Sequence, residues 1–341
     1  MAPSDLSALA SALDDQARAD GMSGVVSIDV DGEPLFARAY GFADRAHGIA
    51  NTPDTRFGMA SASKAFTALT ILSLVDDGAL TMDTPVRGIL NDDLPLIDDS
   101  VTVEHLLTHT SGIGDYLDED SDWEVDDYVL PVPVHELAET EAFVRAIDGQ
   151  PHVSAPGERF AYNNGGYITL AIVAERVGGM PFHDLVAERV FVPAGLEKTA
   201  YLRLDELPGD TAIGYVYDRP DSLRTNVLHL PVRGNGDGGA FTTVSDFSRF
   251  WRALADGAVL AEPLIADMWR PREMVESEGL RYGMGFWLDR EGPGIVLEGF
   301  DAGVSIRSRF DPSSRSTVTI VSNTSEGAWE VVRAFADFLR A

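Results

Sequence analysis

The sequence predicts an α+β fold in which one antiparallel sheet, flanked by helices, is built from both ends of the chain. Strand-like segments occur at residues 24–41 and again at residues 283–322. The stretch between them, residues 86–225, mixes helical segments with long polar loops. Because antiparallel strands pair to bury a shared apolar face, these observations place both ends of the chain in one sheet, with helices inserted between its two halves.

The N-terminal part is predicted to contain one helix and a β-hairpin. The helix covers residues 5–19, and a serine or aspartate at its start suits the N-cap position. Its apolar face consists of Leu6, Leu9 and Leu13. Two strands are expected at residues 24–30 and 35–41, because Asp31-Gly32 between them is a typical hairpin turn pair.

The C-terminal part is predicted to contain four strands and a closing helix. The strands are expected at residues 283–288, 294–298, 303–310 and 316–322. The helix is expected at residues 326–339, because its large apolar residues recur at helical spacing. These residues are Trp329, Val332, Phe335 and Leu339.

A serine and a lysine three residues apart provide the first indication of chemistry. Of the 26 lysines and arginines, only Lys64 and Lys198 are lysines, and Lys64 stands in the sequence Ser61-Ala-Ser-Lys64. The following residues, 65–75, are apolar on nearly every face, which predicts a helix buried in the core. Residues i and i+3 share a helix face, so the Lys64 amine reaches the Ser61 hydroxyl. A desolvated lysine can act as the base that a serine nucleophile needs, whereas the alternative is that Ser61 only caps the helix.

A second polar pair, Tyr162-x-Asn164, lies about one hundred residues later. It occupies a glycine-bounded turn just before an apolar helix predicted over residues 168–177. Residues two apart in extended backbone point the same way, so a Tyr162 hydroxyl can exchange a proton with Lys64 while the Asn164 amide holds a carbonyl or the lysine. The alternative is that Tyr162 packs in the core and Asn164 caps the helix.

Together these pairs resemble the serine β-lactamase and penicillin-binding protein superfamily, in particular its class C β-lactamase-like branch. Further matching segments are residues 57–60, 101–113 (VTVEHLLTHTSGI), 236–246 (GDGGAFTTVSD) and 282–287 (YGMGFW). The branch contains esterases, D-amino-acid peptidases and acyltransferases. The resemblance implies that Ser61 is the nucleophile, with Lys64 and Tyr162 as its catalytic partners. It also implies a sheet domain of residues 1–85 and 226–341, a helical domain of residues 86–225, and an active site between them.

One position departs from the pattern of the superfamily. The third element of the superfamily is Lys-Thr-Gly or His-x-Gly, and here Leu297-Glu298-Gly299 takes its place, with Leu297 where the cation normally stands. Leu297 and Gly299 share a strand face, and Gly299 permits close approach of a ligand. By resemblance, the N–H groups of Phe300 and Ser61 form the oxyanion hole. The missing cation disfavours substrates with a carboxylate, such as β-lactams and peptide C-termini, and favours neutral esters that place an apolar group near Leu297.

An acidic stretch, residues 115–128, has two interpretations. Such a charge run is most often a solvated loop. Its aromatic residues indicate instead a lid with an apolar underside over the active site. These residues are Tyr116, Trp123 and Tyr128.

Composition limits the partners and cofactors. The net charge of −29 argues against nucleic acid and anionic membranes as partners. The chain has no cysteine, and His105 and His109 lack the glutamate of a His-Glu-x-x-His site, so we expect neither a metal nor another cofactor. No signal-peptide pattern and no run of eighteen apolar residues is present, which predicts a cytoplasmic protein without a membrane span.

Three functions agree with these features. The first is a serine esterase or acyltransferase that works through an acyl-enzyme on Ser61. The second is an amide hydrolase acting on β-lactams or D-amino-acid peptides, and the third is a non-catalytic binding homologue. Leu297 favours the first over the second, and the presence of Ser61, Lys64, Tyr162 and Asn164 argues against the third. In the first two the partner is a small ester or amide.

Overall fold

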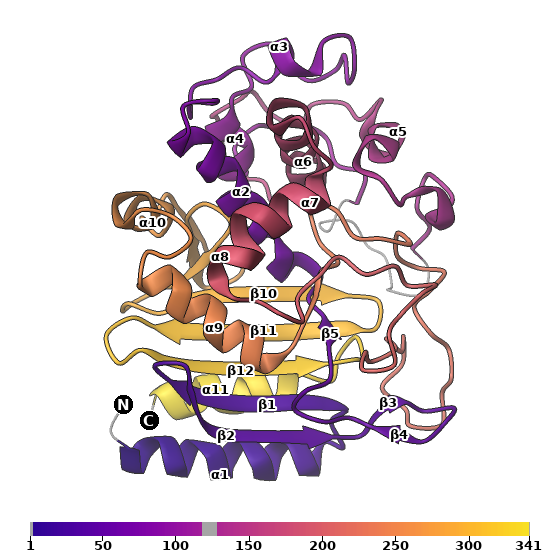
Figure 1. The fold of residues 1–341 in the computed structure, drawn as a ribbon, viewed down its shortest axis with the longest axis vertical. Coiled ribbons are helices and arrows are strands. Elements are labelled where there is room, and N and C mark those ends of the chain that lie inside the picture. The colour runs from indigo at the N-terminus through magenta and orange to yellow at the C-terminus, as the bar shows by residue number, and fades with distance from the viewer. Residues whose placement is uncertain (1–2, 118–127, 341) are drawn as a thin grey trace.

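The computed structural model describes residues 3–117 and 128–340, and at its centre is an antiparallel sheet of eight strands (Figure 1). The order of the strands is β2-β1-β12-β11-β10-β9-β8-β7. Their bounds are β1 Gly24–Val30, β2 Glu33–Tyr40, β7 Glu273–Val275, β8 Leu280–Tyr282, β9 Trp287–Asp289, β10 Ile295–Asp301, β11 Val304–Asp311 and β12 Ser316–Ser322. The sheet is flanked by helices, so the predicted α+β class is confirmed.

Strands from the two ends of the chain pair with each other near the β2 edge of this sheet. Strand β1 pairs with β2 on one side and with β12 on the other, where Val26 lies opposite Ile320. Six of the seven residues of β1 are buried, because helices cover both faces of the sheet at this point. The expectation that N-terminal and C-terminal segments form one sheet is therefore correct.

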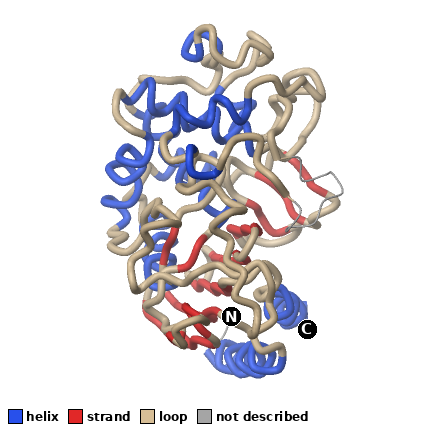
Figure 2. The backbone as a smooth tube through the Cα atoms, turned by 90° about the vertical axis from the view of Figure 1, so that its right-hand side faces the viewer, coloured by secondary structure: helices blue, strands red, loops and turns tan. Residues whose placement is uncertain are grey.

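Two helices cover the outer face of the sheet. They are α1 (Pro3–Ala19) and α11 (Trp329–Arg340), and they lie side by side near the two chain ends (Figures 1 and 2). Leu9 and Leu13 of α1 pack with Phe335 of α11 in one apolar cluster. The apolar faces predicted for the first and last helices are the faces that bury this side of the sheet.

The opposite face of the sheet carries the main core and the helical region. Helix α2 (Lys64–Asp76) is buried from Lys64 to Leu74, because it lies in the main core and packs against other helices of this region. The other helices of the inserted region are α3 Arg87–Leu90, α4 Val103–Leu107, α5 Val144–Ile147, α6 Asn164–Gly178, α7 Phe182–Val186 and α8 Val192–Ala194. Single turns lie at η2 Val134–Glu136, η3 Thr140–Phe143 and η4 Ala187–Phe191. After the insert follow α9 Val244–Ala255 and α10 Glu262–Met268.

Short strand pairs lie outside the eight-stranded sheet. Strand β5 (Phe57–Gly58), just before the Ser-x-x-Lys segment, pairs with β6 (Phe241–Thr242), which comes after the insert. Another pair, β3 (Phe42–Asp44) and β4 (Ile49–Ala50), lies beyond the end of the sheet (Figure 1). The main core continues from the sheet into the helices, and the domain boundaries at residues 85 and 226 stay a prediction.

One predicted strand is wrong in its extent. Residues 283–286 form a turn between β8 and β9, closed by a hydrogen bond from the Gly283 N–H to the Phe286 carbonyl at 2.9 Å. Gly285 has φ of 75°, and a Cβ there would approach the Ala68 side chain of α2. The two glycines therefore serve close packing and a left-handed turn rather than a continuous strand.

Candidate active site

Ser61 lies in a single turn, η1 (Ala60–Ser63), directly before α2. Ala60 has φ of 44°, a left-handed conformation that residues with a side chain rarely adopt. The Gly239 N–H donates a hydrogen bond to the Ala60 carbonyl at 3.3 Å, so the glycine-rich loop after the insert holds this backbone in place. Strained non-glycine residues of this kind gather at functional sites, where the surrounding structure fixes them.

Lys64 is buried beside Ser61, with 2% of its surface exposed. Its Nζ donates to the Ser61 Oγ at 2.9 Å and to the Asn164 Oδ1 at 2.7 Å. A further hydrogen bond, of 2.6 Å, reaches the backbone carbonyl of Asp237. The structure therefore brings together three of the residues that the sequence analysis assigned to the site.

These contacts suit a lysine that exchanges one proton with Ser61. An ammonium group has three hydrogens, and the three oxygens around Lys64 accept them. When Lys64 is neutral, its lone pair can face the Ser61 hydroxyl and accept the serine proton across the same 2.9 Å contact. The Asn164 amide oxygen and the Asp237 carbonyl keep the amine in position in either state.

The side chain of Asn164 contacts Lys64, and its neighbour Asn163 caps the helix. The side chain of Asn163, rather than Asn164, accepts the capping hydrogen bond, from the Gly166 N–H at 2.6 Å. The Asp115 carboxylate accepts hydrogen bonds from the Asn164 N–H at 2.5 Å and the Gly165 N–H at 2.9 Å. Burial raises the pKa of Asp115 to about 7, although these N–H donors and nearby Lys64 act to lower it. The capping alternative for Asn164 is therefore wrong.

Tyr162 lies with its ring against Lys64. The Lys64 Nζ is 4.9 Å from the centre of the Tyr162 ring, within cation–π range. The ring also packs on His109, with a centroid distance of 4.4 Å, and is stacked on Trp287 at 6.1 Å. Both partners come from segments that the sequence analysis matched to the superfamily, and they fix the position of Tyr162 next to the lysine.

His109 supports this arrangement as a neutral side chain. The Asn163 N–H donates to His109 Nδ1 at 3.1 Å, so the ring proton resides on Nε2, which lies 3.1 Å from the Tyr282 hydroxyl. Burial, together with the charge of Lys64, lowers the pKa of His109 well below its usual value. His109 thus adds no positive charge next to Lys64. His105 has a separate role in the capping box of α4: its N–H donates to the Oγ1 of the N-cap residue Thr102, and its Nδ1 accepts from the Thr102 N–H, both at 3.3 Å.

Replacing Tyr162 with phenylalanine tests whether its hydroxyl takes part in proton transfer. If Tyr162 passes a proton between Lys64 and the substrate, we expect kcat to fall about a hundredfold, as is typical for loss of a general acid–base group. The melting temperature should change little, because a phenylalanine ring keeps the packing on His109 and Trp287. Steady-state kinetics and a melting curve of the variant give both values. Unchanged kinetics would leave Tyr162 with a packing role only.

Strand β10 passes close to the nucleophile turn at Gly299. A Cβ at this position would lie 3.0 Å from the Ser61 nitrogen and would overlap the Met59 carbonyl oxygen. Gly299 therefore allows the strand to reach the turn, as expected for the site of a tight backbone approach. The next residue, Phe300, has a side chain that is 40% exposed and lines the cavity beside Ser61. The assignment of the Ser61 and Phe300 N–H groups to an oxyanion hole stays a prediction.

Leu297 occupies a different environment from the one expected for a substrate contact. It is 2% exposed and belongs to the main hydrophobic core, and it does not line the described part of the cavity. Strand alternation turns it, like Gly299, towards the helices that pack on this face. Leu297 therefore affects the site because no cation stands at this position. It does not offer a surface to the acyl group of a substrate.

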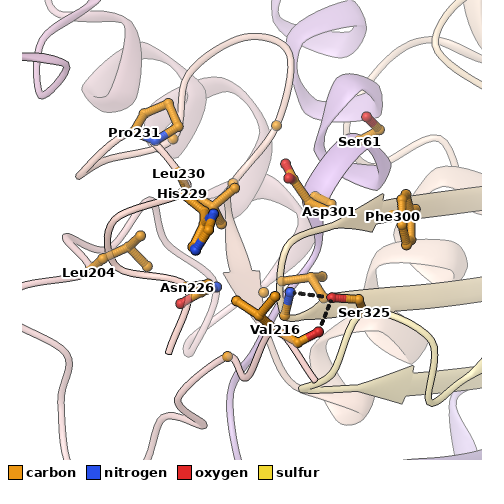
Figure 3. Close-up of a pocket in the computed structure, with 18 of the residues that line it drawn as sticks. Ser61, Leu204, Val216, Asn226, His229, Leu230, Pro231, Phe300, Asp301 and Ser325 are labelled. Carbon is orange, nitrogen blue, oxygen red and sulfur yellow. Dashed lines mark hydrogen bonds between the residues drawn. The ribbon is translucent and has the colours of Figure 1, made fainter. Parts of the chain in front are cut away.

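A cavity of about 510 Å³ opens beside Ser61 (Figure 3). Asn164 and Asp237 line it near Ser61, and Tyr116 and Tyr128 of the predicted lid line it as well. The Tyr116 hydroxyl donates to Asp237 Oδ2 at 2.5 Å. Trp123, the third predicted lid residue, lies outside the described residues.

Asp237 and Asp115 were not identified from the sequence. Burial raises the pKa of Asp237, and the charge of Lys64 opposes this shift. Burial and the adjacent carboxylate of Asp237 raise the pKa of Tyr116, so the proton between them stays on the tyrosine. The only signal for Asp237 in the sequence was its glycine-rich surroundings, and nothing marked Asp115 within its acidic run.

In residues 3–117 and 128–340, no group of three or more His, Asp or Glu side chains is arranged to hold a metal ion. Within the same part of the chain, no helix is long and apolar enough to cross a membrane.

The chain is similar to known proteins over most of its length. The family model described as Beta-lactamase matches residues 6–339. The crystal structure of a penicillin binding protein from Bacillus halodurans has a TM-score of 0.88 and 36% identity, covering 95% of this chain and 99% of that one. Esterase EstB of Burkholderia gladioli is 33% identical over 231 residues, which are 64% of this chain and 58% of that protein. A D-aminopeptidase of Brucella anthropi is 29% identical over 281 residues, 80% of this chain and 50% of that protein.

The chain therefore belongs to the beta-lactamase family, and the relatives to which it is similar include an esterase and a D-aminopeptidase. The resemblance seen in the sequence is confirmed. The chain spans 58% and 50% of the lengths of the two curated relatives described above.

Proposed function

We propose that this protein is a serine hydrolase that forms an acyl-enzyme on Ser61 and acts on neutral carboxylic esters, with water or another alcohol as the final acceptor. The observation that supports the proposal most strongly is the 2.9 Å hydrogen bond between the Lys64 Nζ and the Ser61 Oγ inside a buried polar cluster. A buried lysine has no structural need to contact a serine, and burial is the condition that allows it to give up its proton.

The proposed reaction has two stages. Neutral Lys64 accepts the Ser61 proton while the serine oxygen bonds to the ester carbonyl carbon, and backbone N–H groups at Ser61 and Phe300 stabilise the resulting oxyanion. The bond to the leaving alcohol then breaks, and the alcohol takes a proton from the Lys64 ammonium through Tyr162. In the second stage, water gives a proton to Lys64 through the same groups while its oxygen bonds to the acyl carbon. The bond between that carbon and the Ser61 oxygen then breaks, the carboxylic acid leaves, and the Ser61 oxygen takes back the proton from Lys64.

The charges in the cavity indicate which substrates are disfavoured. Among the described residues that line the cavity, four are carboxylate side chains and none is lysine or arginine. The four are Asp218, Asp237, Asp301 and Glu326. A substrate with its own carboxylate would meet like charges and no lysine or arginine in this lining, so the lining supports uncharged acyl donors.

A comparison of one cephalosporin with its own methyl ester isolates the effect of the carboxylate. A charge-assisted hydrogen bond to a cation contributes about 1.5–3 kcal/mol, so its absence is expected to lower kcat/KM for the acid by about one to two orders of magnitude relative to an enzyme with the cation. We expect kcat/KM for p-nitrophenyl acetate to exceed kcat/KM for either form of the cephalosporin. Because the carboxylates of the lining repel the free acid but not its methyl ester, kcat/KM for the methyl ester should exceed that for the free acid by about tenfold. A higher kcat/KM for the free acid than for both neutral substrates would contradict the preference for neutral esters.

Amide hydrolysis is the second candidate function, and the same lining supports one form of it. Carboxylates at the cavity attract a substrate that carries an amine, as in an amino-acid amide. D-Phenylalanine p-nitroanilide, assayed beside the esters, tests this candidate with the same chromophore class. A protein that hydrolyses neither esters nor amides would be a non-catalytic homologue, and the proposal for Ser61 would fail.

A further inference from the structure

The cavity beside Ser61 has an apolar wall formed by two loops of the inserted region and its return to the sheet. The wall lies across the cavity from Ser61, as the side chains of Leu204 and Pro231 show (Figure 3). Its members are Leu130, Leu202, Leu204, Leu207, Leu230 and Pro231. Except for Leu130, these residues are neither buried nor fully exposed, so each retains apolar surface that an occupant of the cavity could cover.

Backbone hydrogen bonds hold this wall in place although it contains no regular helix or strand. The Leu204 N–H donates to the Val232 carbonyl at 2.7 Å, and the Val232 N–H donates to the Val134 carbonyl at 2.9 Å. An isolated antiparallel bridge joins Arg203 to Arg233. The leucines therefore lie on loops that are joined by backbone hydrogen bonds. The free-energy cost of ordering these loops when a ligand binds is expected to be small.

The position of the proton donors determines which part of an ester faces this wall. The leaving alcohol must lie next to the Lys64 amine and Tyr162, because it takes its proton from them. Neither residue is among the described residues that line the cavity, although Asn164 and Asp237, which contact Lys64, do line it next to Ser61. The acyl group, which stays bonded to Ser61, is the part of the substrate that reaches into the cavity.

We propose that the wall of Leu202, Leu204, Leu207, Leu230 and Pro231 is an acyl-binding subsite that selects medium-length alkyl or aryl acyl groups. This inference rests on the proposed function of Ser61. A cavity of about 510 Å³ is large enough for a ligand well beyond an acetyl group, which would leave the leucines uncovered. Each methylene that enters the subsite adds apolar burial in the acylation transition state, provided that the wall stays in place.

The test is a series of p-nitrophenyl esters from acetate to decanoate with wild type and three variants. In wild type, kcat/KM is expected to rise about fourfold per methylene until the subsite is filled. Leu204→Gln and Leu230→Ala should each lower kcat/KM for octanoate about tenfold and leave acetate within about twofold. The matched control is Leu228→Ala, because Leu228 is 78% exposed and does not line the described part of the cavity. This variant should follow the wild-type series.

A wild-type series that is flat, or variants that lower acetate and octanoate equally, would overturn the subsite while leaving the esterase proposal intact. If no ester is hydrolysed, the proposed function fails instead, and the subsite is tested by binding. Octylboronic acid and methylboronic acid are then compared by calorimetry. Tighter binding of the octyl compound that is lost in Leu204→Gln supports the subsite, and equal binding of the two compounds refutes it.

Discussion

Replacing Ser61 with alanine is expected to lower kcat several thousandfold or more, which is the scale of loss when a catalytic nucleophile is removed. Lys64→Arg is expected to be nearly as damaging. Arginine keeps the positive charge but does not release its proton near neutral pH, so it cannot accept the proton of Ser61. Its larger planar group also does not fit the three acceptors that now surround the Lys64 Nζ. Steady-state hydrolysis of p-nitrophenyl acetate measures both losses.

Lys198 offers a matched control for the lysine substitution. It is the only other lysine in the chain, and its side chain is 38% exposed and forms an ion pair with Asp210. Lys198→Arg should therefore keep wild-type activity, because an exposed ion pair tolerates the exchange. Retention of more than about a tenth of the activity in Lys64→Arg would show that the lysine only positions Ser61 by its charge.

The substitution Gly299→Ala is expected to produce the next largest loss after those of Ser61→Ala and Lys64→Arg. The added methyl group would overlap the Met59 carbonyl and lie 3.0 Å from the Ser61 nitrogen, so strand β10 must move away from the nucleophile turn. The two N–H groups assigned to the oxyanion hole would then separate. Loss of one such donor typically lowers kcat by about a hundredfold to a thousandfold, and we expect a loss in this range.

Gly88→Ala serves as the control for this experiment. Gly88 lies in α3, and a Cβ there meets no atom within 4 Å, so the same chemical change should leave activity and melting temperature near wild type. The melting temperature of Gly299→Ala separates a local displacement from general unfolding. A folded Gly299→Ala protein with wild-type kcat would contradict the assignment of this strand to the oxyanion hole.

The sequence predicted those parts of the site that depend on local structure. Ser61 and Lys64 are three residues apart at the start of a helix, and their contact follows from helix geometry together with the apolar residues after them. The same holds for the hairpin of β1 and β2, whose turn chemistry is local. Recognition of the family then placed Tyr162 and Asn164 beside Lys64, although they are about one hundred residues away.

Features that depend on tertiary contacts were not predicted. The Asp237 carbonyl reaches Lys64 from 173 residues away, and Asp115 approaches the start of α6 from 49 residues away. Neither residue has a local pattern that distinguishes it from other aspartates in an acidic chain. Leu297 was placed correctly on a strand, but whether its side chain faces the cavity or the core depends on the elements that pack on that strand.

The leucine wall of the cavity also has no signature in the sequence. Leu202, Leu204 and Leu207 stand in a loop that forms no helix or strand, and the hydrogen bond from the Leu204 N–H to the Val232 carbonyl joins this loop to the segment of Leu230 and Pro231. Partly exposed leucines in a loop are common in proteins and attract no attention in a sequence. Their proposed role follows from their position across the cavity from Ser61.

The claim that Ser61 is the nucleophile is tested most directly by covalent labelling. The wild-type protein is treated with a fluorophosphonate, which reacts with activated serines, and the modified peptide is mapped by mass spectrometry. We predict a single label per chain, located on Ser61, which is absent in Ser61→Ala and strongly slowed in Lys64→Arg. A label on any other serine, or labelling that persists in Ser61→Ala, would contradict the account.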